Sequence, residues 1–67
     1  MRMTVNGEER DCEAANLAEL CTAEGVEPGR RGIAVALNGR VVPREDWDRT
    51  ALAPQDRVEI VRAFAGG

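Results

Sequence analysis

The sequence contains no histidine and no lysine, so all nine of its basic residues are arginine. Without histidine, the chain lacks the side chain that most often acts as a general base near neutral pH. Without lysine, it offers no ε-amine at which another protein could be joined through an isopeptide bond. These two absences disfavour an enzyme in its own right and a polymerising protein tag.

Cysteine is also scarce, with only Cys12 and Cys21 present. Their spacing matches neither a C-x-x-C motif nor a zinc-binding pattern, and no histidine is available to complete a site or to activate a thiolate. We therefore expect both thiols to be packing residues in a reducing compartment, and we predict no metal site.

No apolar run approaches the roughly 20 residues that a membrane-spanning helix needs, and no signal-peptide core follows the first three residues. The net charge of −3 argues against nucleic acid, which favours a basic surface. A chain of 67 residues has room for one small domain. We expect a cytoplasmic protein that binds neither membrane nor nucleic acid and is a monomer when free.

The first half of the chain predicts a hairpin followed by a helix. Residues 1–5 alternate apolar and polar side chains, Asn6 and Gly7 suit a type I′ turn, and residues 8–12 form the returning strand. Asn16 is a suitable N-cap, Glu19 is placed to complete a capping box, and Gly25 is placed to end the helix. One face of this helix holds Leu17, Leu20, Cys21 and Glu24.

A second hairpin follows the helix. The continuous apolar run Ile33–Leu37 predicts a strand that is buried on both faces, and Asn38 and Gly39 repeat the type I′ signal before a return at residues 40–42. Pro43 ends that strand, and residues 44–47 are expected to form one helical turn.

The last third of the chain predicts a core aromatic residue, a turn and a final strand. We expect Trp47 to fill the core, Pro54 to set a turn, and residues 57–64 to form the last strand. On this strand one face carries Val58, Ile60 and Phe64, and the other carries Val61 and Ala63.

Two hairpins, one main helix and an amphipathic last strand predict an α+β protein with a mixed sheet of four to five strands. We expect the first and last strands to pair at the centre of the sheet, which is the β-grasp architecture of ubiquitin-like proteins. Residues 1–67 would form a single domain, with residues 65–67 as an exposed, flexible and reactive tail.

Gly66 and Gly67 close the sequence. Because neither residue has a Cβ atom, an enzyme could draw them through a channel too narrow for any side chain. The reactive group would then be the α-carboxylate of Gly67.

The ordered combination of these features resembles the ThiS family of sulfur carriers in thiamine biosynthesis, over essentially the whole chain. The resemblance rests on Asn38-Gly39-Arg40-Val41-Val42-Pro43-Arg44, then Trp47, Thr50 and Leu52, then Asp56-Arg57-Val58-Glu59-Ile60-Val61, and finally Gly66-Gly67. The chain departs from the family at Gln55, where a glycine is common. Glutamine would be strained by on the order of 1 kcal/mol if that turn needs a positive φ, whereas a type I turn after Pro54 would avoid the strain.

The resemblance implies a reaction cycle at Gly67. An E1-like adenylyltransferase would use ATP and magnesium to adenylate the carboxylate, and sulfur supplied through a cysteine desulfurase would convert it to a thiocarboxylate. Thiazole synthase would then receive the sulfur. The chain itself would hold no permanent cofactor and no catalytic residue, and it would dock to its partners near the tail through Val61, Arg62, Ala63, Phe64 and Ala65.

Three alternatives stay open at the level of sequence. One is the small subunit of molybdopterin synthase, another Gly-Gly sulfur carrier, whose members tend to have prolines before the glycines. The others are a ubiquitin-like protein modifier and a β-grasp interaction module in which the Gly-Gly pair has no role.

Overall fold

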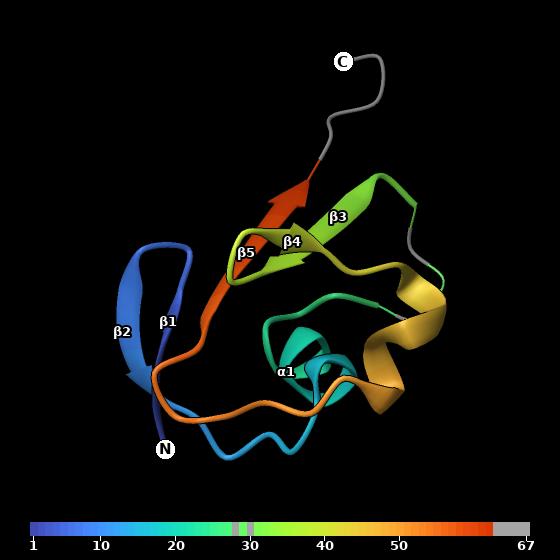
Figure 1. Cartoon of the computed structure of the whole chain (residues 1–67). Helices are drawn as coiled ribbons and strands as arrows, with labels where there is room; N and C mark the ends of the chain where they lie inside the picture. Colours follow the sequence, from blue (N-terminus) through green and yellow to red (C-terminus); the bar gives the residue numbers. More distant parts are fainter. Residues whose placement is uncertain (28, 30, 63–67) are drawn as a thin grey trace.

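The computed structural model describes residues 1–27, 29 and 31–62, and these form one mixed sheet with an α-helix against one of its faces (Figure 1). The elements, in chain order, are β1 (Arg2–Val5), β2 (Glu8–Asp11), α1 (Leu17–Ala23), β3 (Ile33–Leu37), β4 (Arg40–Val41), the 3-10 helix η1 (Arg44–Arg49) and β5 (Arg57–Arg62). The five strands lie in the order β2-β1-β5-β3-β4. The first and last strands are therefore adjacent at the centre, as predicted, and they run parallel.

Both hairpin turns have the predicted backbone. Asn6 and Gly7 have φ values of 51° and 82°, and Asn38 and Gly39 have φ values of 52° and 86°. Two consecutive residues with positive φ define the type I′ turn, whose twist matches that of the flanking strands. The Asn-Gly pairs thus fix the register of both hairpins.

The N-terminus of α1 is capped by Asn16, whose Oδ1 accepts the backbone N–H of Glu19 at 2.8 Å. In return, the Glu19 carboxylate accepts the backbone N–H of Ala15 at 2.9 Å, one residue before the cap. The predicted reciprocal capping is present, but its second bond goes to Ala15 instead of Asn16.

Gly25 terminates α1, as predicted, in a Schellman motif. Gly25 has a φ of 87° and donates its N–H to the Thr22 carbonyl at 3.1 Å, while Val26 donates to the Cys21 carbonyl at 2.9 Å. Val26 is itself buried, so the motif brings an apolar side chain back toward the core.

The core lies between α1 and the inner face of the sheet and consists of Met3, Val5, Cys12, Leu17, Leu20, Cys21, Val26, Val35, Trp47, Val58 and Ile60. Both cysteines are buried and free, in agreement with their predicted packing role. Trp47 is buried as predicted, and its Nε1–H donates to the Val42 carbonyl at 2.9 Å. The Arg44 guanidinium lies 4.6 Å from the centroid of the Trp47 ring, within cation–π range.

The prediction that β3 is buried on both faces was wrong. Only Val35 is fully buried, whereas Ala34 is exposed. The reason is that α1 covers one face of the sheet, so alternate residues of β3 lie on the outer face (Figure 1). The small alanines at these outer positions made the run look uniformly apolar.

The turn before β5 adopts the strained geometry that the sequence left open. Gln55 has a φ of 74°, and Asp56 donates its N–H to the Ala53 carbonyl at 3.2 Å. Positive φ at the third position of this turn, directly after Pro54, is characteristic of a type II turn, for which glycine is the preferred residue. The type I alternative was therefore wrong, and Gln55 is in a conformation that side chains other than those of Asn and Asp rarely adopt.

Candidate functional site

The predicted reactive group at Gly67 lies outside the described residues, as do Ala63, Phe64, Ala65 and Gly66. Of the predicted tail and docking residues, the structure describes Val61 and Arg62, which end β5. The described part of the site is therefore the end of the sheet from which β5 leads into the predicted tail (Figure 1).

β5 is held along both edges, but for different lengths. On one edge it pairs with β3 from Val58 to Arg62, so that Arg62 lies opposite Ile33. On the other edge, the register with β1 extends only to Val58. The support from β1 therefore ends well before the end of β5.

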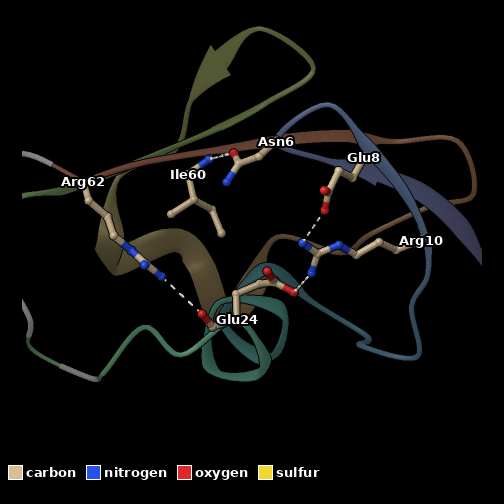
Figure 2. Close-up of polar contacts among 6 residues, drawn as sticks. All are labelled: Asn6, Glu8, Arg10, Glu24, Ile60 and Arg62. Carbon is tan, nitrogen blue, oxygen red and sulfur yellow. Dashed lines mark hydrogen bonds and ion pairs between the residues drawn. The ribbon is translucent and has the colours of Figure 1, made fainter.

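Asn6, in the β1–β2 turn, continues the hydrogen bonding to β5 on the β1 side. Its backbone N–H donates to the Val58 carbonyl at 2.9 Å, and its side-chain Oδ1 accepts the backbone N–H of Ile60 at 2.7 Å (Figure 2). The asparagine side chain thus takes the place of a backbone carbonyl in the ladder. Beyond Ile60, this edge of β5 is no longer supported by the β1–β2 hairpin.

The side chain of Arg62 makes a contact beyond Ile60, on the face of β5 that meets α1. Its Nη2 donates to the backbone carbonyl of Glu24, at the C-terminal cap of α1, at 3.1 Å (Figure 2). This bond joins residues 38 positions apart in the sequence. Sequence reasoning selected Arg62 as a docking residue, but the structure directs its side chain to the helix.

Glu24 is also held through its side chain. Its carboxylate forms an ion pair with Arg10 of β2, whose guanidinium also pairs with Glu8 at 3.1 Å (Figure 2). The hydrogen bonds to Glu24 and then to Glu8 raise the pKa of the Arg10 guanidinium, so this group stays charged. The end of α1 is thereby connected to β2 through the Glu24 carboxylate and to β5 through the Glu24 carbonyl.

The outer face of the sheet carries an apolar patch beside the end of β5. Val61 is 61% exposed and Val41 is 72% exposed. Val61 lies opposite Ala34, and Val41 lies opposite Ala36, so the four side chains share one face. We call Ala34, Ala36, Val41 and Val61 the outer patch.

Within the described ranges 1–27, 29 and 31–62, no three cysteine, aspartate or glutamate side chains are grouped so that they could hold a metal ion. Burial raises the pKa of the Cys21 thiol, which disfavours the reactive thiolate. The longest α-helix that the structure describes has seven residues, too few to cross a membrane.

Comparison with known proteins identifies a family over nearly the whole length. The model of the ThiS family matches residues 3–67. The chain is 27% identical to the sulfur carrier protein ThiS of Escherichia coli K12, and the match covers all of both chains.

A second relative is a much longer protein. Over 68 residues, the chain is 38% identical to a thiazole synthase of Paramagnetospirillum magneticum, in a match that covers all of this chain and 20% of the relative. The chain thus spans only a fifth of the length of that thiazole synthase.

Solved structures share this fold. A crystal structure of a thiamine biosynthesis protein, ThiS, from Geobacter metallireducens superposes with a TM-score of 0.80, at 36% identity and with full coverage of both chains. An NMR solution structure of a thiamine biosynthesis protein from the same organism gives a TM-score of 0.80, at 36% identity and with 88% of that chain covered. These matches confirm the predicted β-grasp fold.

Proposed function

Because the chain belongs to the ThiS family, we propose that it is a sulfur carrier of thiamine biosynthesis and that it carries sulfur on the α-carboxylate of Gly67. The observation that carries this proposal is the family match, which extends to residue 67 and so includes both terminal glycines. The match to the sulfur carrier protein of Escherichia coli K12, which covers all of both chains, supports the same function.

The proposed chemistry takes place in partner enzymes. A carboxylate is a poor electrophile, so an E1-like adenylyltransferase would first join the Gly67 carboxylate to the α-phosphate of ATP, with magnesium, and release pyrophosphate. A cysteine desulfurase would supply the sulfur as an enzyme persulfide, which would displace AMP to form an acyl disulfide. A thiol would then reduce that disulfide, releasing the Gly67 thiocarboxylate and leaving the former persulfide sulfur carrier in a disulfide with the thiol. The thiocarboxylate is a stronger nucleophile than the carboxylate that it replaces, which suits it to transfer sulfur in the following step.

We propose thiazole synthase as the acceptor of the sulfur. Support comes from the relative in Paramagnetospirillum magneticum, a thiazole synthase of which one fifth resembles this whole chain. A carrier-like segment within a thiazole synthase chain is expected if the two activities cooperate. The molybdopterin-type carrier is not the family that matches.

The outer patch is the proposed docking surface for these partners. Val41 and Val61 leave most of their side-chain surface in water, and Val61 lies one residue before the end of β5. A partner that covers the patch would gain hydrophobic free energy of about 25 cal/mol for each Å² of apolar surface buried. The same partner would then be close to the point where the chain leaves the sheet.

In this proposal the protein is a substrate and carrier, and it contributes a tail and a docking surface instead of catalytic groups. The described cysteines fit this role because both are buried in the core. The protein-modifier alternative would require ligation to lysines of other proteins. No observation on this chain favours that alternative over sulfur transfer.

Mass spectrometry tests the proposal directly. We would incubate the protein with the cognate adenylyltransferase, ATP, magnesium, cysteine and a desulfurase. The intact mass should rise by the difference between sulfur and oxygen, and fragmentation should place the change on Gly67. The Cys12→Ser, Cys21→Ser variant, as a matched control, should gain the same mass, whereas a change located on Cys12 or Cys21 of the unsubstituted protein would refute the proposal.

A further inference from the structure

The C-terminus of α1 lacks a cation of its own. No basic residue lies in its last turn, although the free carbonyls there carry a partial negative charge. Arg62 supplies the missing cation from β5, a distant part of the sequence, through its bond to the Glu24 carbonyl. The bond therefore combines a hydrogen bond with a favourable charge–dipole interaction.

The acceptor for Arg62 is fixed by the backbone. The N–H of Glu24 donates to the Leu20 and Cys21 carbonyls, and the Schellman bonds of Gly25 and Val26 fix the next two residues. The Glu24 carboxylate is occupied by Arg10, so Arg62 binds the main chain of Glu24 and not its side chain (Figure 2). These backbone bonds should therefore keep the Glu24 carbonyl in place even when the pair between the Glu24 carboxylate and Arg10 is weakened.

The Arg62 bond is also located where β5 has lost support on one edge. The last contact from the β1–β2 hairpin is the bond between Asn6 and Ile60, and beyond it the ladder continues only on the β3 side. A strand end that is paired on one edge alone frays more readily than one held on both. The Arg62 side chain adds a tie beyond Ile60 from the face of β5 that meets α1, to the capped end of that helix.

We propose that Arg62 is a positioning residue for adenylation: by binding the helix C-terminus, it fixes the direction in which the chain leaves the sheet toward Gly67. This inference rests on the proposed sulfur-carrier function. Arg62 need not touch ATP or the reacting carboxylate, since it acts by holding the end of β5.

The expected effect is on binding and not on chemistry. A carrier whose strand end is already ordered loses less conformational freedom when the tail enters an enzyme, and so binds more tightly. Once the tail is inside the enzyme, the channel itself orients the carboxylate. Loss of the Arg62 bond should therefore raise KM for the carrier and leave kcat unchanged.

Arg62→Gln is the test variant, because it removes the charge and keeps most of the length of the side chain. We expect KM for the carrier in adenylation, followed by pyrophosphate exchange, to rise about two- to fivefold, the factor that a cation at a helix C-terminus typically supplies. NMR order parameters of the Val61 and Arg62 amides in the free protein should fall in the same variant. Arg62→Lys keeps a cationic donor and should recover part of both effects.

Two controls separate the positioning role of Arg62 from loss of the Arg10–Glu24 pair and from loss of one positive charge. Glu24→Gln weakens the pair with Arg10 but keeps the backbone carbonyl, so it should leave KM and the two order parameters unchanged. Arg2→Gln removes an arginine that pairs with Glu9 near the opposite end of β1, and it controls for the loss of one positive charge.

The outcomes are distinct. An unchanged KM in Arg62→Gln would overturn the proposal, and so would a raised KM with unchanged order parameters, since that result indicates direct contact with the enzyme. An equal effect of Glu24→Gln would overturn the assignment of the carbonyl as the anchor. If the unsubstituted protein is not adenylated at all, the proposed function fails, and the order parameters alone then decide whether Arg62 holds the strand.

Discussion

Asn6 and Ile60 are 54 residues apart, and the side-chain oxygen of Asn6 accepts the backbone N–H of Ile60 at 2.7 Å. The turn residue Asn38 acts in the same way on the other edge, where its Oδ1 accepts the backbone N–H of Arg57 at 2.9 Å. Each type I′ turn therefore uses the side chain of its asparagine to hold β5. The residue that permits the turn also secures the central strand.

The two roles of Asn6 can be separated by substitution. Asn6→Gly keeps the positive φ but leaves the Ile60 N–H without its partner, and should lower the free energy of unfolding by about 1 kcal/mol. Asn6→Ala loses the same bond and adds the cost of a left-handed alanine, about 1 kcal/mol more. Urea denaturation measures both values, and equal stability of the glycine variant and the unsubstituted protein would show that the bond contributes nothing.

Gln55 is expected to be a site where substitution stabilises the protein. Its φ of 74° disfavours glutamine, so Gln55→Gly should relieve strain. Part of the gain is offset because glycine is more flexible in the unfolded state, which leaves a net stabilisation of about 0.5–1 kcal/mol. Thermal denaturation should show a higher Tm for Gln55→Gly and a smaller increase for Gln55→Asn, and a lower Tm for the glycine variant would contradict the strained turn.

Cys21 should make stability depend on alkaline pH. Burial raises the pKa of its thiol above the ordinary value of 9.0, so the unfolded chain loses this proton first as the pH rises. Cys21 therefore has no effect on the pH dependence well below pH ~9, and stability falls as the pH rises through and beyond that value. Between about pH 8 and pH 10, chemical denaturation should show a smaller decrease in the free energy of unfolding for Cys21→Ala than for the unsubstituted protein. Equal decreases in the two proteins would show that the Cys21 thiol does not contribute to the pH dependence.

The local features of the fold were predictable because each has a short-range cause. The Asn-Gly pairs require positive φ, Asn16 offers an N-cap, and Gly25 suits the end of a helix. The central pairing of β1 and β5 followed from the order of these elements. Residue patterns within a few positions were enough for the turns and the helix ends, whereas the strand pairing was inferred from the order of the elements along the chain.

The contacts that support the end of β5 were not predictable in this way. The Asn6–Ile60 and Arg62–Glu24 bonds join residues 54 and 38 positions apart, and nothing in the local sequence of either partner indicates the other. The exposure of Ala34 was missed for a different reason, since an apolar run with alanines at its outer positions does not reveal which face meets the helix. The two long-range hydrogen bonds and the exposure of Ala34 all depend on how the elements pack in the tertiary structure.

The outer patch should bind partners without contributing to stability. Val61→Asp places a charge on an exposed position of the sheet, so the Tm should change little, whereas the Kd for the adenylating enzyme should rise at least about tenfold, since each 1.4 kcal/mol of lost binding is tenfold. Ala15→Asp, on an exposed position just before the N-terminus of α1, is the matched control. Calorimetric titration measures both variants, and an equal affinity for the two would remove the outer patch as the docking surface.

Gly66→Ala separates the chemistry of the tail from the stability of the fold. If residues 65–67 form the exposed tail that we predict, one added methyl group should change the free energy of unfolding by less than about 0.5 kcal/mol. Inside a channel shaped for glycine, the same methyl group would displace the Gly67 carboxylate from ATP, and a misplacement of 1 Å can lower the rate about 100-fold. Pyrophosphate exchange should therefore fall steeply while the Tm hardly moves. An unchanged rate of pyrophosphate exchange would show that no narrow channel excludes a side chain at residue 66, and the requirement for glycine there would be refuted.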